Sequence, residues 1–357
     1  MKVFHNPQHS RHYPRHFLVS GAPQPNPEVP ERADALLDAA LAGGHDVVEQ
    51  DTDFGLGPVA AVHTPEYLSF LMHIFARWQR IDGASEEVIP NIHPNGRRGG
   101  YPASAVGQAG YHMADTACPI SAGTWPAALA SAHVAVAAAR EVLAGAPAAY
   151  ALCRPPGHHA FADMAGGFCY VNNTSVAAQE LRARHARIAI LDVDLHHGNG
   201  TQGIFYGRDD VLTVSLHADP VRFYPFFWGH ADERGEGPGL GYNLNLPLAR
   251  GTGDDEYFLA LERALHRIRA FAPGALVSRC AQGRSAGRPG ALHGRVRAYR
   301  RRHRGPGTGQ RPGSRRWLSD RRPRHQSAGL SAWFRGAPAH MIPSEIRDHG
   351  QFLVELD

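Results

Sequence analysis

Segments with helical periodicity alternate with strand-like segments over the first 277 residues of the chain. Apolar side chains recur at helical spacing in four segments. Glycines mark the ends of some of these segments, and acidic first turns and basic last turns, which match the helix dipole, mark others. We therefore expect helices at 31–44, 124–145, 173–185 and 254–271.

Continuous apolar runs predict strands that are buried on both faces. Such runs occupy 187–194, 211–219 and 272–278. Buried strands separated by helices indicate an α/β protein, with a mostly parallel central sheet and helices on both faces. The segment 82–117 is rich in Gly and Pro and has few apolar residues, so we expect a long surface excursion there.

Polar residues with metal-binding side chains follow the first of these strands, in LDVDLHHGNG (191–200). In parallel sheets, ligands bind beyond the carboxyl ends of the strands. In an extended chain Asp192, Asp194 and His196 project to one side. Asp194 and His196 can then share one metal ion, with Asp192 behind them and His197 nearby. The alternative is that these residues only cap turns.

Two adjacent histidines, His158 and His159, follow the stiff turn Pro155–Gly157 in CRPPGHHA (153–160). A lone buried histidine is more often structural than catalytic, but a tandem pair on a rigid loop favours catalysis. A neutral histidine beside a zinc site can take a proton from a water that attacks an amide carbonyl. The residue types therefore indicate metal-assisted amide hydrolysis, although they do not define the substrate.

Two aromatic residues follow Gly or Pro turns, Phe168 in GGFCYVNN (166–173) and Tyr224 in DPVRFYPFF (219–227). Aromatic side chains at the carboxyl edge of a sheet can form the walls of a narrow slot for an extended apolar chain. Each of them alone is more typical of ordinary packing.

Charge is distributed very unevenly along the chain. The 357 residues carry a formal charge of +4, but 278–337 contains 16 Arg and one acid, a local charge of +15, which leaves 4 − 15 = −11 elsewhere. The basic block raises the possibility of nucleic-acid binding.

No apolar run is long enough for a membrane helix, no secretory signal is visible, and the four cysteines show no C-x-x-C spacing, so we expect a soluble, cytoplasmic protein.

Several motifs together resemble the histone deacetylase superfamily, most closely the bacterial acetylpolyamine amidohydrolases and histone deacetylase-like amidohydrolases. These motifs are RPPGHHA, GGFCYVNN, LDVDLHHGNGTQ and VSLHADP, and the resemblance extends over 1–277. It implies the arginase/deacetylase α/β fold and the zinc-dependent removal of acetyl groups from amines. It also implies a homodimer, since 82–117 resembles an insertion that narrows access and supports dimers in the polyamine branch.

The resemblance also implies roles for individual residues. Asp194 and His196 match two of three zinc ligands, and His158 and His159 match the catalytic pair, with His159 as the general base. Asp192 matches the partner of His158, and Asn199 matches a residue that is Asp in some members. The tunnel walls correspond to Phe168, Tyr224 and Gly167. The main-chain ligands of a structural K⁺ correspond to Asp192, Asp194, His196 and Ser215.

The family pattern stops after residue 277, where the third zinc ligand and a catalytic tyrosine are expected. No Asp or Glu occurs between Ser278 and Ser319, and Leu, Ile, Val and Phe total only five in 278–337. We divide the chain into an incomplete catalytic domain (1–277), an Arg-, Gly- and Pro-rich segment (278–337) and an unassigned tail (338–357).

A shifted reading frame is the interpretation that we favour for 278–337, ahead of a natural replacement and of a solvated basic arm. The leading hypothesis is a zinc amidohydrolase for acetylpolyamines or acetyl-lysine, impaired in this chain because ligands are missing. The alternatives are a catalytically dead pseudoenzyme, a nucleic-acid-binding protein that uses the Arg-rich segment, and an arginase-like hydrolase with two metal ions, which we rank low because arginases lack the RPPGHHA loop.

Overall fold

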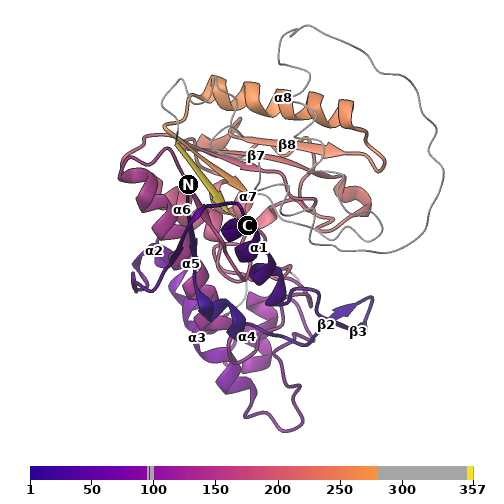
Figure 1. Ribbon diagram of the computed structural model, residues 1–357. Helices are drawn as coiled ribbons and strands as arrows, with labels where there is room; N and C mark the ends of the chain where they lie inside the picture. Colours follow the sequence, from indigo (N-terminus) through magenta and orange to yellow (C-terminus); the bar gives the residue numbers. More distant parts are fainter. Residues whose placement is uncertain (95, 97–99, 280–351, 357) are drawn as a thin grey trace, which may run out of the picture.

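A parallel sheet forms the centre of the computed structural model, which describes residues 1–94, 96, 100–279 and 352–356 (Figure 1). Within this part of the chain the sheet has eight strands, in the order β4-β1-β5-β10-β9-β6-β7-β8, and every neighbouring pair is parallel. The strands are β1 (Lys2–His5), β4 (Asp46–Glu49), β5 (Ala148–Ala151), β6 (Ile188–Asp192), β7 (Val211–Ala218), β8 (Asn243–Leu248), β9 (Ala275–Arg279) and β10 (Phe352–Leu356).

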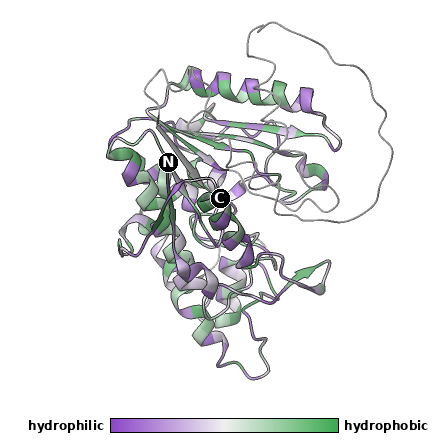
Figure 2. Cartoon of the chain, viewed as in Figure 1, coloured by the Kyte–Doolittle hydropathy of each residue, from purple (hydrophilic) through white to green (hydrophobic). Residues whose placement is uncertain are grey.

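Helices cover both faces of this sheet, as the continuous apolar runs predict. Ile188 and Ile190 of β6 pack in a cluster with α5 (Thr124–Leu143) and α6 (Asn173–Leu181). Ala189 and Leu191, which alternate with them, pack in another cluster with α8 (Asp254–Phe271). Figure 1 shows α8 running along β7 and β8, and Figure 2 shows the alternating apolar and polar positions of this helix.

The predicted elements lie where the sequence places them, and most of them have shorter ends. The helix expected at 31–44 is α1 (Glu31–Ala42), and α8 spans its whole predicted range. The helix expected at 173–185 ends at Leu181, and the strand expected at 187–194 ends at Asp192. The α/β prediction, with a mostly parallel sheet between helices, is confirmed.

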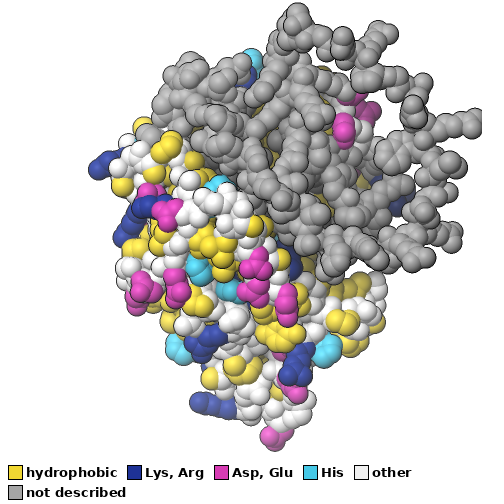
Figure 3. All heavy atoms as spheres, viewed as in Figure 1, with side chains coloured by type: hydrophobic (Ala, Val, Ile, Leu, Met, Phe, Trp, Pro, Cys, Tyr) yellow, Lys and Arg dark blue, Asp and Glu magenta, His cyan; other side chains and the backbone are white. Residues whose placement is uncertain are grey.

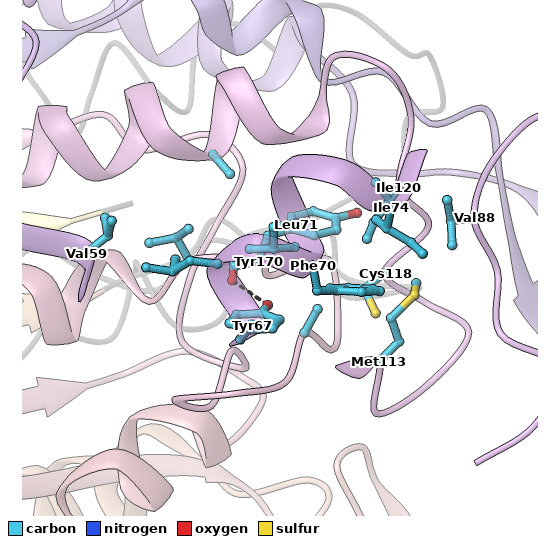
Figure 4. Close-up of a cluster of buried hydrophobic side chains, with 14 of the residues drawn as sticks. Val59, Tyr67, Phe70, Leu71, Ile74, Val88, Met113, Cys118, Ile120 and Tyr170 are labelled. Atoms are coloured by element: carbon cyan, nitrogen blue, oxygen red, sulfur yellow. Dashed lines mark hydrogen bonds between the residues drawn. The ribbon is translucent and has the colours of Figure 1, made fainter. Parts of the chain in front are cut away.

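The second half of the predicted surface excursion is packed into the molecule, so that part of the prediction is wrong. The segment contains α4 (Ala105–His112), which lies against α3 (Pro65–Trp78). Ala109 and Met113 are fully buried in a cluster with Ile74 (Figure 4). The helix was not predicted because it is only eight residues long and contains two glycines, which disfavour helices.

Smaller elements complete the described part of the chain. They comprise α2 (Gly57–Ala60), α7 (Asn199–Phe205), an antiparallel hairpin of β2 (His16–Val19) and β3 (Ala22–Pro25), and 3₁₀ turns at Pro7–Arg11, Pro220–Arg222 and Gly237–Gly239. Among the described residues, no helix combines the length and the apolar character that crossing a membrane requires. Acidic and basic side chains are interspersed on the described part of the face in Figure 3.

Two strands extend the fold beyond residue 277. The third predicted strand continues to Arg279, and Arg279 pairs in register with Asp192 of β6. Strand β10 lies between β5 and β9, so five residues of the tail that we left unassigned take a central place in the sheet. The Arg-rich segment, apart from its first two residues, lies outside the described residues.

Leu212 offers a test of the core. It is 0% exposed in β7, whereas Leu259 of α8 is 62% exposed. We expect Leu212→Ala to lower the free energy of unfolding by about 2–5 kcal/mol because it leaves a cavity. Urea denaturation measures this, with Leu259→Ala as the matched control, for which we expect a small change. Equal losses in the two variants would contradict the packing described here.

Candidate active site

The polar residues of LDVDLHHGNG lie at the carboxyl edge of the sheet, directly after β6. Asp192 is the last residue of β6, and its register partners are Ser215 in β7 and Arg279 in β9. Asp192 is 4% exposed and Asp194 is 5% exposed, so two carboxylates are buried within one short turn. Hydrogen bonds or an opposite charge must therefore compensate the two negative charges at this edge of the sheet.

Backbone amides provide the first part of that compensation. The amide of Asp194 donates to Asp192 Oδ1 over 2.9 Å, and the amide of His196 donates to Asp194 Oδ1 over 2.7 Å. Beyond Asp192 the chain is thus turned rather than extended, which corrects the geometry that we expected. Both aspartates do cap turns, as the alternative interpretation proposed, and both also contact ionisable side chains.

The two tandem histidines each meet a residue from the segment after β6. His158 Nδ1 lies 2.8 Å from Asp192 Oδ2, and His159 Nδ1 lies 2.7 Å from Asn199 Oδ1. Their ring centroids are 3.8 Å apart. Burial lowers the pKa of both histidines well below the usual value. The Arg279 guanidinium lowers the pKa of His158 further, and the neighbouring rings of His158 and His196 lower that of His159 further.

Neutral His159 is suited to accept a proton. An amide oxygen accepts hydrogen bonds, so His159 Nδ1 carries the hydrogen that points to Asn199 Oδ1. The lone pair of Nε2 is then available to a reacting water. The lowered pKa keeps the ring in this neutral form at neutral pH.

Arg279 is a site residue that the sequence analysis did not single out. Its Nη1 atom lies 2.6 Å from Asp194 Oδ2, 2.9 Å from His158 Nδ1 and 3.7 Å from Asp192 Oδ1. Burial alone would raise the pKa of Asp194, but this guanidinium together with the hydrogen bond to His196 and the nearby His158 holds the pKa well below its usual range. The position of Arg279 at the end of a predicted strand was the available signal.

The predicted zinc ligands are neighbours, but the described residues do not complete a zinc site. Asp194 Oδ1 lies 3.3 Å from His196 Nδ1, whereas the other carboxylate oxygen of Asp194 contacts Arg279. Within 1–94, 96 and 100–279, no group of three His, Cys, Asp or Glu residues could hold a metal ion. A complete structural or catalytic zinc site needs at least three protein ligands. The donor set here therefore does not fit zinc.

Tyr224 and Gly167 form a wall beside His159. The Tyr224 ring meets the His159 ring edge-on at 4.9 Å. The Tyr224 hydroxyl donates to Asp115 Oδ2 over 2.7 Å, and the Gly167 amide donates to the same oxygen over 3.1 Å. Burial and Asp115 raise the pKa of Tyr224 well above its usual value. Asp115 went unnoticed because it lies in the predicted surface excursion.

Other aromatic residues extend this wall. The ring of Phe168, whose φ is 67°, lies 5.5 Å from Phe17 of the β2–β3 hairpin. Phe223, which the sequence analysis did not single out, stacks on His196 at 5.0 Å. Phe168, Gly167 and Tyr224 remain our prediction for the substrate tunnel, now with Phe223 beside them.

His197 belongs to a different polar cluster. Its Nε2 atom lies 3.2 Å from Asn245 Oδ1 of β8, and its ring lies 4.6 Å from that of His217.

The chain brings Asp192 and Ser215 together as register partners, with Asp194 and His196 in the following turns. A potassium ion on these four main-chain carbonyls stays a prediction.

A parallel sheet between helices, with a histidine pair and two aspartates at its carboxyl edge, defines the class of arginase/deacetylase-fold hydrolases. The chain belongs to the histone deacetylase family, because the histone deacetylase domain matches residues 26–303.

The relatives of the chain include named enzymes. It is 51% identical to acetylpolyamine amidohydrolase of Burkholderia pseudomallei (strain 1710b) over 281 residues, which cover 78% of this chain and 81% of the relative. It is 47% identical to acetylpolyamine amidohydrolase 1 of Pseudomonas aeruginosa over 282 residues, with coverage of 78% and 81%.

Solved structures agree with these relatives. The crystal structure of acetylpolyamine aminohydrolase from Burkholderia pseudomallei superposes with a TM-score of 0.76 at 50% identity and covers 78% of this chain and 81% of that one. The deacetylase homologue from Aquifex aeolicus gives 0.60 at 28% identity, with coverage of 79% and 68%. The family resemblance, the fold and the enzyme class inferred from the sequence are confirmed at the level of the family.

Gly167 is the position where the wall tolerates no side chain. Its φ is +49°, and a Cβ atom there would lie 2.5 Å from His159 Cδ2 and 2.7 Å from the Tyr224 hydroxyl. Gly237 has the same φ of +49° with no atom within 4 Å of such a Cβ. We expect Gly167→Ala to lower the free energy of unfolding by about 1–3 kcal/mol more than Gly237→Ala, because only the former adds a clash. Denaturant unfolding of both variants measures the difference, and equal effects would show that the wall is open at this point.

Proposed function

We propose that the chain carries the substrate slot and the proton-transfer residues of a zinc-dependent deacetylase for acetylated amines, and that the chain itself is impaired in hydrolysis. The observation that carries this proposal is the pair of oriented histidines. His158 meets Asp192, His159 meets Asn199, and the pair lies beside the wall of Tyr224 and Gly167.

The chain's own residues have separable roles in this proposal. Tyr224 and Gly167 confine an extended acyl-amine chain beside His159, and Asp115 holds both wall residues in place through its carboxylate. His159, neutral and buried, takes the proton of the attacking water. We derive no hydrolytic step through zinc, since the described residues supply only Asp194 and His196 as ligands.

An acetylated polyamine is the substrate class that the relatives' names suggest, and acetyl-lysine is an alternative with the same chemistry. The charge of −11 outside 278–337 favours a cationic substrate through electrostatic steering. A homodimer, a cytoplasmic location and a bound K⁺ stay predictions. The contact between Arg279 and Asp194 favours the pseudoenzyme as the second candidate.

A binding measurement tests the proposed substrate slot, and a hydrolysis measurement tests the proposed impairment. We expect the chain to bind monoacetylated 1,4-diaminobutane more tightly than the unacetylated diamine, and Tyr224→Ala to weaken binding about tenfold because the slot loses a wall. Calorimetric titration measures both, with Tyr13→Ala, at a side chain that is 51% exposed, as the matched control.

Hydrolysis by the same preparation is expected to be slow. We expect acetate release at least about 10²-fold slower than by the Burkholderia relative assayed beside it, because a missing oxyanion donor alone costs that much. Failure to bind the acetylated diamine contradicts the proposed slot, whereas acetate release at the relative's rate contradicts the proposed impairment.

The gene itself tests the interpretation of 278–337. We expect the nucleotides that encode this segment, read one base later, to encode a Gly-Gly-Gly-Tyr sequence in place of 315–318 and an aspartate ligand upstream of it. Sequencing of the region in all three frames measures this directly. A protein expressed from the restored frame should gain hydrolysis. Stop codons throughout both other frames contradict a shifted frame and leave a natural replacement.

A further inference from the structure

Arg279 places a fixed positive charge among the acidic groups of the candidate active site. It is the last residue of β9, and the parallel register with β6 sets it opposite Asp192. Its side chain is 5% exposed, and the side chains of Asp192 and Asp194 are each 6% exposed. All three charges are therefore removed from water together.

The guanidinium compensates part of the negative charge of the two buried carboxylates. A guanidinium stays charged at every physiological pH, and it forms strong hydrogen bonds to carboxylate oxygens. The distance of 2.6 Å between Arg279 Nη1 and Asp194 Oδ2 is that of such a bond. A metal ion bound to the same oxygen would lie next to this fixed positive charge, which opposes its binding.

We propose that Arg279 is a built-in cation that competes with a divalent metal for Asp194, so that this chain excludes the metal from its own site. The proposal rests on the hydrolase site proposed above and adds the residue that controls its metal occupancy. It adds an electrostatic obstacle at Asp194 to the lack of a third ligand among the described residues.

A second contact of Arg279 falls on the histidine pair. His158 Nδ1 lies 2.8 Å from Asp192 Oδ2 and 2.9 Å from Arg279 Nη1. A carboxylate accepts and a guanidinium only donates, so one ring nitrogen cannot satisfy both partners at once. Arg279 therefore competes with Asp192 for His158 as well as with the metal for Asp194.

Buried arginine is not by itself a sign of this role, as Arg154 demonstrates. The side chain of Arg154 is 3% exposed, and its Nε atom lies 3.0 Å from Glu28 Oε1. This guanidinium contacts Glu28 and the main-chain carbonyl of His9 rather than Asp194 or His196. Arg154→Met is thus a matched control that removes a buried, paired guanidinium away from the candidate metal ligands.

Metal binding by Arg279→Met tests the proposal without an activity assay. We expect Zn²⁺ to bind this variant about ten- to a hundredfold more tightly than it binds the unmutated protein, because a competing cation is gone. Equilibrium dialysis measures zinc content, and Co²⁺ absorption reports ligation. Thermal melts should show that Arg279→Met is destabilised without metal and is stabilised by added Zn²⁺. Arg154→Met should lose stability with no response to Zn²⁺.

Adding Asp194→Asn to Arg279→Met should abolish the gain in zinc binding, which places the metal at the proposed ligand. Equal zinc affinities for the unmutated protein and Arg279→Met overturn the proposal. Saturable, stoichiometric zinc binding by the unmutated protein overturns it as well, even if Arg279→Met does not fold. Zinc binding gained without binding of acetylated amines would support this inference while contradicting the proposed function.

Discussion

The burial of two neighbouring carboxylates at the end of β6 is the constraint on which the candidate site depends. Asp192 and Asp194 are both buried, and a buried carboxylate is costly unless hydrogen bonds and an opposite charge compensate it. Two backbone amides, the His158 ring and the Arg279 guanidinium provide that compensation. The turn after β6, the orientation of His158 and the end of β9 therefore follow from one electrostatic requirement.

Local periodicity predicted four helices and three of the eight strands in the described sheet, which was sufficient for the layered class of the fold but not for its long-range pairing. The runs that became β6, β7 and β9 are apolar throughout because helices cover both faces of the sheet. Nothing in that periodicity gives the order of strands. The register that sets Asp192 between Ser215 and Arg279, and the insertion of β10 beside β9, arise only when distant segments pair.

The same distinction applies to the site. His158, His159, Asp194 and His196 could be proposed because each pair is compact in the sequence and follows a recognisable turn or strand. Asp115 and Tyr224 are 109 residues apart, and their hydrogen bond depends on the packing of a Gly- and Pro-rich excursion whose helix is only eight residues long. Phe223 gave a weak signal for a different reason, since an aromatic residue in a Pro-rich turn is usually ordinary packing.

The uneven charge of the chain and the incomplete metal site meet at one residue. Arg279 is the first of 16 arginines between 278 and 337, and it is also the last residue of a strand that the family fold requires. The Arg-rich segment therefore begins while the chain is still inside the sheet. Arg279 in this register faces two buried aspartates. Their electrostatic attraction for a buried guanidinium is stronger than it would be for a guanidinium exposed to water. The residue at the end of β9 thus supplies a cation beside the two candidate metal ligands that the described residues provide, Asp194 and His196.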